Sequence, residues 1–258
     1  MTSKVYSSDT YQLEYYAGKV EALLKDIDRN ATFSTLERNA TVRTGDVLFT
    51  GKQSIAEFFG PNSSSIRVGS EVTVELEGPQ SVYLAGGTIL VCLPEENTRF
   101  SVRSSIAQAS YQGRGTFFIE CTENGGFKII HLEGKGIYST EKGGELKLRG
   151  GQLCFVIRKP SEFGEIFDID ILLLVGTSRL LNAFPELPST ISRIGLTVYT
   201  QDLLMKSKYN ALIGDAPTDK KIQLWALENS KDNETPSTSK PSKKTGFFRR
   251  IFGNKKEE

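Results

Sequence analysis

Residues 112–151, QGRGTFFIECTENGGFKIIHLEGKGIYSTEKGGELKLRGG, decide the fold class of this chain. Aromatic and β-branched residues fill two runs, at 116–120 and 127–132, and glycines separate these runs from their neighbours. Glycines of this kind stand where a turn needs a positive φ or where two backbones approach closely. We therefore predict short antiparallel strands, with turns at Gly113-Arg114-Gly115 and at Gly134-Lys135-Gly136.

The strands expected before this stretch follow the same pattern. Residues 71–77, EVTVELE, alternate most regularly, with valines and leucine on one face and threonine and acids on the other. That period predicts a strand with one solvated face. Turn signals recur about every 8 to 12 residues between 40 and 158, and one of them predicts a hairpin turn at Gly86-Gly87. This rhythm indicates an antiparallel sandwich, barrel or β-solenoid and leaves no room for βαβ units.

The composition is that of a globular protein. The 258 residues are 38% hydrophobic and 24% charged, which suits a chain that buries one large core. The net charge of +1 gives no bulk attraction to nucleic acid or to a membrane, so we expect no nucleic-acid partner. Electrostatic targeting would have to come from a local cluster of charges.

Cysteine and histidine usage gives no sign of a metal or cofactor site. Cys92, Cys121 and Cys154 are widely spaced in apolar runs, which predicts buried thiols rather than disulfides or a zinc site. His131 is the only histidine, so a site that needs several imidazoles is excluded within one chain. We expect no metal and no cofactor.

The N-terminal residues are polar and lack a clear period. We interpret residues 1–16 as a lead-in strand or a loose arm, and residues 18–26 as a first strand in preference to a helical turn. Residues 11–20 are too polar for the apolar core of a secretory signal, so the chain as printed is expected in the cytoplasm.

The spacing of apolar residues changes after Pro160. Residues 165–183 carry apolar residues at helical spacing, with acids first and Arg179 last, which predicts one buried helix that ends before Pro185. The apolar window 166–184 contains three charges, which makes it a poor transmembrane span. Residues 191–204 are ambiguous, and residues 221–227 predict a short strand. We interpret 161–228 as a small mixed α/β extension.

The C-terminal end combines a disordered linker with a basic, aromatic segment. Residues 229–245 are polar and aperiodic, which predicts disorder. Residues 243–256 carry six positive charges, no acid and four large apolar residues. That pattern suits a plain solvated tail, an amphipathic membrane anchor or a docking peptide for a protein groove, and our hypothesis is a tethered attachment point. The candidate partner-binding or membrane-binding residues are Phe247, Phe248, Arg249, Arg250, Ile251 and Phe252.

The order of glycines and strands between residues 17 and 160 resembles the FecR domain family. The matching segments are RTGDV at 43–47, TG at 50–51, SIAEF at 54–58, SIRVG at 65–69, VTVEL at 72–76, GTFFI at 115–119, LEG at 132–134 and LRGGQ at 148–152. The resemblance implies an all-β, partly solenoidal domain at 17–160, preceded by an arm at 1–16. It also implies a domain that binds protein partners and has no catalytic site.

In signalling members of that family the domain lies in the periplasm and is joined by a membrane helix to an anti-sigma segment. The resemblance therefore implies a bacterial, periplasmic setting, whereas the printed N-terminus indicates cytoplasm. The chain departs from the family plan because it lacks the anti-sigma segment and the membrane helix, and its region after Pro160 is unfamiliar.

Three chemical interpretations compete with simple structural ones. His131 and Glu133 would lie on one face of a strand, where a histidine and a carboxylate can exchange a proton. Asp168 and Asp170 could ligate a cation, although acids also favour a helix start. The glycine pairs could hold phosphate, but no helix follows them. In each case the structural interpretation is favoured.

The leading hypothesis is a non-enzymatic interaction or scaffold protein, tethered by its tail to a membrane or a protein partner. An alternative is a structural subunit that forms oligomers through open sheet edges. A further alternative is a carbohydrate-binding β protein with Tyr83, Tyr111 or Tyr138 as stacking platforms.

Overall fold

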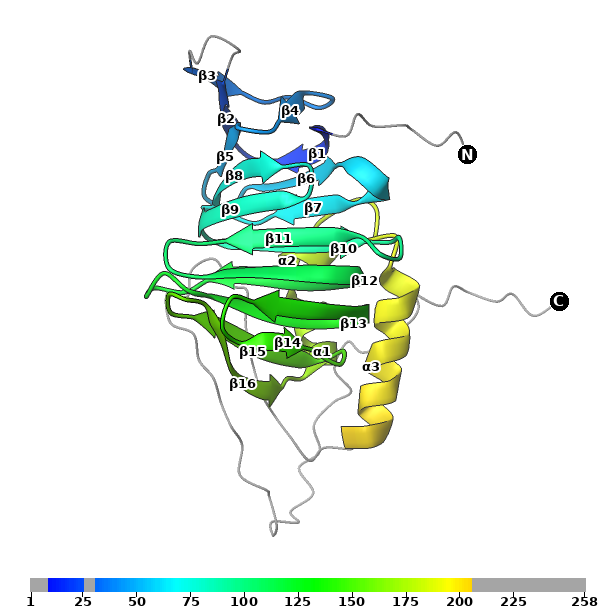
Figure 1. Cartoon of the computed structure of the whole chain (residues 1–258). Helices are drawn as coiled ribbons and strands as arrows, with labels where there is room; N and C mark the ends of the chain where they lie inside the picture. Colours follow the sequence, from blue (N-terminus) through cyan, green and yellow to red (C-terminus); the bar gives the residue numbers. More distant parts are fainter. Residues whose placement is uncertain (1–8, 26–30, 206–258) are drawn as a thin grey trace, which may run out of the picture.

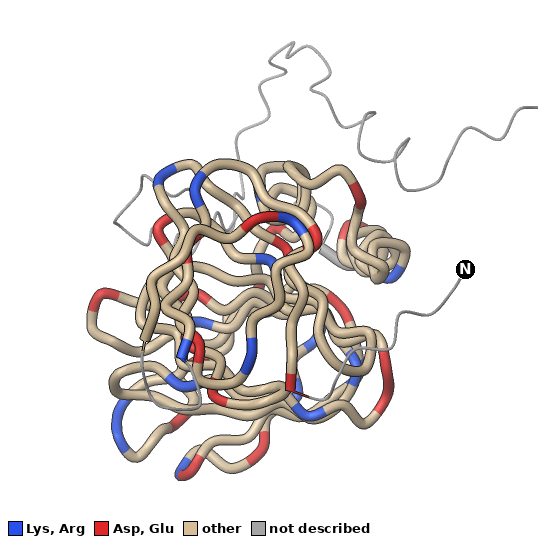
Figure 2. Tube along the Cα trace, turned by 90° about the horizontal axis from the view of Figure 1, so that it is seen from above, with Lys and Arg blue, Asp and Glu red and all other residues tan. Residues whose placement is uncertain are grey.

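The computed structural model describes residues 9–25 and 31–205, and in this part of the chain the protein is mainly β. Sixteen strands join in one large mixed sheet that curls into a half-barrel. Figure 1 shows the strands stacked from β3 at one end to β16 at the other, with the helices on one side, and Figure 2 shows the curl from above. The predicted mainly β class is confirmed.

The strands follow one another with short connections. The first ten are β1 (Thr10–Ala17), β2 (Val20–Lys25), β3 (Ala31–Thr35), β4 (Thr41–Arg43), β5 (Val47–Thr50), β6 (Ile55–Phe59), β7 (Ser65–Val68), β8 (Thr73–Gly78), β9 (Ser81–Gly86) and β10 (Thr88–Leu93). The others are β11 (Arg99–Arg103), β12 (Gln108–Cys121), β13 (Phe127–Thr140), β14 (Gly144–Leu146), β15 (Gln152–Ile157) and β16 (Glu162–Asp168). A short 3-10 helix, η1 (Pro61–Ser63), precedes β7, and the α-helices are α1 (Ile171–Thr177), α2 (Arg179–Asn182) and α3 (Ile191–Met205).

The sheet is built around the long hairpin of β12 and β13, which pair along most of their 14 residues each. The other side of β12 pairs with β11 through residues 108–112 and with β10 through residues 115–120. From β11 one arm continues through β9, β8, β5 and β2 to β3, and from β10 the other continues through β7, β6 and β1 to β4. Both arms therefore start from one hairpin, and the sheet between them curls.

The turns predicted at residues 113–115 and 134–136 are wrong, because these glycines lie in the middle of β12 and β13. Gly113 pairs with Gly136, and Gly115 pairs with Gly134. A Cβ added at Gly113, where φ is 142°, would lie 2.3 Å from the carbonyl oxygen of Lys135. The glycines thus permit a close backbone approach at the point where the hairpin passes from one arm to the other.

The prediction of a hairpin turn at Gly86-Gly87 is also wrong, because the connection there is not a hairpin. The two glycines do join β9 to β10, but these strands belong to different arms and do not pair. Gly87 has a φ of 86°, and a Cβ there would lie 2.5 Å from Cγ2 of Val72. This position is a crossover between the arms.

The core has two layers, and the strands of the second arm contribute to both. Ile89 and Val91 of β10 belong to the cluster inside the half-barrel, whereas Leu90 belongs to the cluster beneath the helices. Ile129 and Ile130 of β13 divide in the same way. Strands covered on both faces read as continuous apolar runs. By contrast, residues 71–77 keep one solvated face, as their alternation predicts.

The strand interpretation of the N-terminal residues is confirmed where the structure describes them. β1 pairs with β4 and with β6, and Leu13 is fully buried in the interior cluster. β2, which pairs with β3 and β5, confirms the strand expected within 18–26.

The single helix predicted at 165–183 is wrong. Residues 162–168 form β16, which pairs with β15, and the helical part begins only at α1. Asp170 is the N-cap of α1, and its carboxylate accepts a hydrogen bond of 2.9 Å from the backbone N–H of Leu173. Ser178 adopts an extended conformation and separates α1 from α2. An apolar run does not by itself distinguish a paired strand from a helix.

The ambiguous residues 191–204 form a helix, α3, and the strand predicted at 221–227 lies outside the described residues. Within the described part of the chain, none of the helices has the length and hydrophobicity of a bilayer-spanning segment.

Candidate functional site

Helix α3 is fixed to the sheet by a buried carboxylate. The side chain of Glu133 on β13 is almost wholly buried, and its Oε2 accepts a hydrogen bond of 2.8 Å from Nε of Arg193. Its Oε1 accepts a second bond, of 2.7 Å, from the hydroxyl of Thr116. The Thr116 hydroxyl also lies 2.6 Å from that of Thr190, whose carbonyl accepts the N–H groups of the first turn of α3. This network sets where α3 begins.

A β-bulge lets Glu133 reach the helix. Thr116 pairs with Glu133, but the next residue, Phe117, pairs with His131, so Leu132 is the extra residue on β13. Glu133 consequently contacts Arg193, whereas His131 lies among the aromatic rings of the interior. The expectation that the two side chains share one face is wrong, and neither the favoured structural pair nor the alternative proton-transfer pair of His131 and Glu133 forms.

His131 is a buried and neutral interior group. Its Nδ1 lies 2.8 Å from the hydroxyl of Tyr138, and its ring packs against Phe117. Burial lowers the pKa of His131 to about 4, although the backbone of Gly134 opposes part of this shift. The imidazole is therefore uncharged near neutral pH.

The second half of α3 is held by an amide side chain and by apolar packing. Gln201 accepts a hydrogen bond of 3.0 Å from the N–H of Ile171 and donates one of 2.8 Å to the carbonyl of Ile169. Ile194 and Val198 are buried in the cluster beneath the helices. The inward face of α3 is thus committed to the sheet and to the start of α1.

The segment that leads into α3 is fixed by a buried arginine. Nε of Arg67 on β7 lies 2.6 Å from the carboxylate of Glu57, and its two terminal nitrogens donate to the carbonyls of Leu180 and Glu186. The guanidinium also lies 4.2 Å from the ring centroid of Phe184. Burial raises the pKa of Glu57, and Arg67 opposes that rise. Both ends of the α2–α3 connection are therefore positioned by the sheet.

The outward face of α3 carries an exposed row of apolar side chains, which we call the α3 stripe. It consists of Leu196, Tyr199 and Leu203, which are 63%, 53% and 50% exposed. Their spacings of three and four residues place them on one helix face. Of the six large hydrophobic residues exposed in the described chain, three lie in this row. Figure 1 shows α3 standing beside the stack of strands. Because these exposed apolar side chains are grouped on one face of a helix held to the sheet, the α3 stripe is the first candidate site.

A second candidate is a polar trough at the turn between β11 and β12. A cavity of about 80 Å³ is lined by residues 103–108, Glu141, Lys159 and Ser161, and an adjoining one of about 220 Å³ shares Gln108 and Glu141. The hydroxyls of Ser110 and Ser139, which lie 2.9 Å apart, line the larger cavity. Such a surface could hydrogen-bond a polar ligand.

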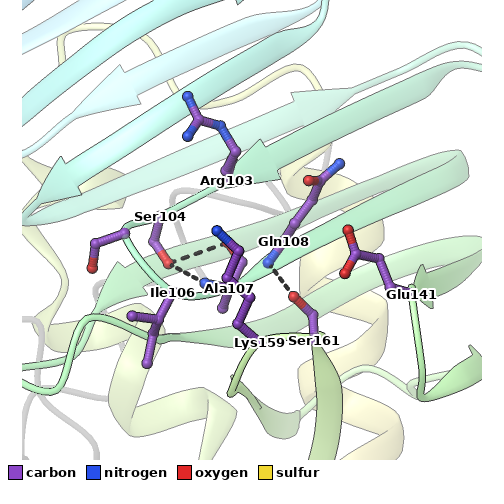
Figure 3. Close-up of a pocket in the computed structure, with 9 residues that line it drawn as sticks. Arg103, Ser104, Ile106, Ala107, Gln108, Glu141, Lys159 and Ser161 are labelled. Carbon is purple, nitrogen blue, oxygen red and sulfur yellow. Dashed lines mark hydrogen bonds between the residues drawn. The ribbon is translucent and has the colours of Figure 1, made fainter.

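The groups of this trough are largely used by the protein itself. Ser161 accepts a hydrogen bond of 2.7 Å from the backbone N–H of Gln108, and Ser104 binds the backbone of Ala107 (Figure 3). Arg103 pairs with Glu77, and its guanidinium lies 4.5 Å from the ring centroid of Tyr83. The polar groups of the trough therefore stabilise the turn between β11 and β12, and the trough is a weaker candidate for a binding site than the α3 stripe.

The tyrosines expected as sugar platforms are poorly placed. Tyr111 and Tyr138 are buried, because they pack on each other and on the interior face of the hairpin. Tyr83 is half-buried, and Arg103 covers its ring. The expectation that Tyr111 or Tyr138 presents a ring to a ligand is wrong.

The remaining sequence candidates are also structural where the structure describes them. The carboxylate of Asp168 accepts a hydrogen bond of 3.2 Å from the amide of Gln152, and that of Asp170 caps α1. Among the described residues, no group of three or more His, Cys, Asp or Glu side chains is arranged to hold a metal ion. Cys92 and Cys154 are buried free thiols, as predicted, and Cys121 is half-buried.

The predicted tail site lies outside the described residues, and it comprises Phe247, Phe248, Arg249, Arg250, Ile251 and Phe252. The α3 stripe was missed by sequence reasoning, although its signal is present. The spacing of Leu196, Tyr199 and Leu203 is helical, but Gly195 and the β-branched residues around it weaken the helical pattern.

No protein-family model matches the chain, and no match was found among curated proteins.

Proposed function

We propose that the protein is a non-enzymatic interaction module whose half-barrel positions α3 as a recognition helix. The observation that carries the proposal is the α3 stripe, which is exposed while the opposite face of the helix is fixed by Glu133, Arg193 and Gln201. A rigid helix with apolar residues at a spacing of three and four suits an apolar groove or a second amphipathic helix on a protein partner.

The absence of catalysis is part of the same proposal. His131 is buried and neutral, and its neighbours are aromatic. The carboxylate of Glu133 is engaged by Arg193 and Thr116. The strongest chemical candidates of the sequence therefore have structural duties that account for their positions.

We propose further that the half-barrel is a FecR-type β domain of partly solenoidal and sandwich-like construction. The resemblance in the glycine and strand order supports this assignment, and so does an interior enclosed by two arms. A FecR-type domain would act as a scaffold or signalling module that binds a protein partner. The periplasm is then the compartment in which it would act.

Site-specific photocrosslinking tests the proposal. The full chain would carry benzoylphenylalanine at Tyr199 or, as a matched control, at Phe33 of β3, which is exposed to a similar extent, 58% against 53%. We expect a discrete adduct with another protein from position 199, whereas position 33, on the open edge of β3, should crosslink to nothing other than a second copy of this chain. The adduct should disappear when Leu203→Asp is added. Equal labelling at both positions, or no adduct at 199 even when the tail anchors are removed by Phe247→Ser/Phe248→Ser, would sink the proposed function.

A second candidate, self-assembly through sheet edges, is favoured by β3. This strand pairs only with β2 in the described structure, its residues 31–35 carry no charge, and Phe33 is exposed. Uncharged open edges are templates for pairing with another chain. Light scattering across a concentration series, with and without residues 229–258, would detect an oligomer that persists without the tail. A monomer in both forms would remove this candidate.

The basic, aromatic tail is the proposed attachment point of the module to an anionic membrane or to a protein. Each Lys or Arg near an anionic leaflet contributes about 1 kcal/mol. Co-sedimentation of the full chain with anionic vesicles, compared with the variant Phe247→Ser/Phe248→Ser, tests the membrane version. Failure to bind anionic lipid would leave the protein version.

A further inference from the structure

We propose that residues 243–256 of the same chain fold back onto the α3 stripe and cover it. This inference rests on the proposed function, because it assumes that the α3 stripe is an interaction surface. The inference is that this surface binds a segment of its own chain, which is basic and carries aromatic side chains.

The covering segment is close enough to reach the stripe. Residues 206–258 follow α3 directly, and the segment is separated from the helix by a run of roughly 37 residues that is rich in Ser, Thr, Lys and Asn. The run has 30 residues outside the strand predicted at 221–227, and a random coil of 30 residues has an end-to-end distance of about 27–33 Å. A 15-residue helix is about 22 Å long, so the segment can reach any point of α3.

The apolar residues of the two elements have compatible spacing. Phe247, Phe248, Ile251 and Phe252 recur at separations of one, three and four residues, which place them on one face of a helix. The α3 stripe is a single row with the spacing of a coiled-coil seam. A row of Leu and Tyr beside a face rich in Phe forms an apolar contact between two helices.

The charges of the two elements are opposite. Helix α3 contains one acid, Asp202, and one base, Arg193, whereas residues 243–256 contain six basic side chains and no acid. Asp202 is exposed on α3 itself, directly beside Leu203 of the α3 stripe. Arg193 is engaged with the carboxylate of Glu133, so the exposed charge of the helix beside the α3 stripe is that of Asp202. Opposite fields favour this docking orientation.

The size of the stripe favours a tethered segment over a second copy of the chain. The exposed surface area of three side chains is far smaller than the roughly 800 Å² that each partner of a stable dimer buries. A short tether raises the effective concentration of its segment to the order of millimolar, which makes a small contact effective. A membrane or partner that captures Phe247 and Phe248 would then uncover the α3 stripe.

Disulfide trapping in the full chain tests the proposal. The pair Thr200→Cys/Asn254→Cys places one thiol beside the α3 stripe and one beside the aromatic anchors without altering either. The matched control is Thr32→Cys/Asn254→Cys, in which the same tail thiol meets an exposed threonine position on β3. The native thiols compete poorly, because Cys92 and Cys154 are buried and burial raises the pKa of Cys121 to about 12.

We expect the intramolecular disulfide to form about tenfold faster at position 200 than at position 32, and at a rate independent of protein concentration. Adding Leu196→Ser/Leu203→Ser, or Phe247→Ser/Phe248→Ser, should reduce the rate to that of the control, because either change removes apolar contact without adding charge. Equal rates for the two pairs would overturn the inference, as would a product that is mainly intermolecular.

The two proposals fail separately. If trapping shows no preference while photocrosslinking at Tyr199 still gives a partner adduct, the self-covering contact is wrong and the recognition helix stands. If trapping succeeds, the photoadduct at Tyr199 should rise severalfold in the variant Phe247→Ser/Phe248→Ser. If photocrosslinking gives no adduct even in that variant, the stripe serves the tail alone.

Discussion

The two faces of the central hairpin bury polar groups of different kinds. The interior face holds one neutral histidine, His131, among aromatic rings. The helix side of the sheet holds three ion pairs, each with at least one buried partner, namely Glu57–Arg67, Glu120–Lys128 and Glu133–Arg193. The interior must be filled to shape by apolar side chains, whereas the helices must be placed at one position on a broad surface. Directional polar bonds supply that placement, and two of the three pairs contact the segments that carry the helices.

The largest effect should come from removing one partner on the helix side. Arg67→Met leaves the buried Glu57 carboxylate without its cation, and we expect a loss of about 4 kcal/mol in the free energy of unfolding, measured with urea. The double variant Arg67→Met/Glu57→Gln is the control and should regain at least half of the loss, because it removes the unpaired charge. A loss below about 1 kcal/mol for the single variant would contradict the role of the pair.

The next largest effect tests the hairpin itself. Gly113→Ala should lower the free energy of unfolding by about 3 kcal/mol, because the new Cβ would lie 2.3 Å from the carbonyl oxygen of Lys135 at a φ of 142°. Gly86→Ala is the matched control, since a Cβ there meets nothing within 4 Å. The two variants should therefore differ in urea midpoint, and equal midpoints would refute the close approach of the two strands.

The sequence predicts a strand, turn or site correctly where the feature depends on neighbouring residues alone, and it fails where the feature depends on pairing with a distant strand. The strand at 71–77 was predicted correctly because one of its faces is solvated and alternation records that directly. The four glycines of the hairpin were misread as turns, because nothing local shows that Gly113 faces Gly136 on another strand. The candidate pair of His131 and Glu133 failed for a similar reason, since one bulge at Leu132 reverses the side on which Glu133 lies.

The interior histidine provides a smaller, pH-dependent effect. The pKa of His131 is lowered from 6.5 to about 4 in the folded protein, so the unfolded chain binds a proton first as the pH falls. The contribution of neutral His131 to the free energy of unfolding is therefore fully present above about pH 6.5 and is lost as the pH falls from 6.5 to 4. The loss from this group is about 2 kcal/mol at pH 5. Because the sequence has one histidine, His131→Gln should flatten this part of the profile. Urea midpoints measured from pH 8 to pH 5 would show it, and an unchanged profile in the variant would contradict the assignment.

The smallest effect on stability should come from the α3 stripe, and this is what separates recognition from packing. Made in the variant Phe247→Ser/Phe248→Ser, which removes the tail anchors, Leu196→Gln replaces a side chain that is 63% exposed, so the free energy of unfolding should change by no more than about 0.5 kcal/mol. Val198→Ala, two residues away on the inward face, removes buried methyl groups and should lower stability by about 2 kcal/mol. The two variants should have the opposite ranking in their effect on binding at the α3 stripe. Leu196→Gln should lose the photoadduct at position 199, whereas Val198→Ala should retain it at temperatures where that variant is folded. If Leu196→Gln instead destabilises that variant as much as Val198→Ala does, then a part of the folded chain other than the tail anchors covers the outward face of α3, and the proposed recognition helix is wrong.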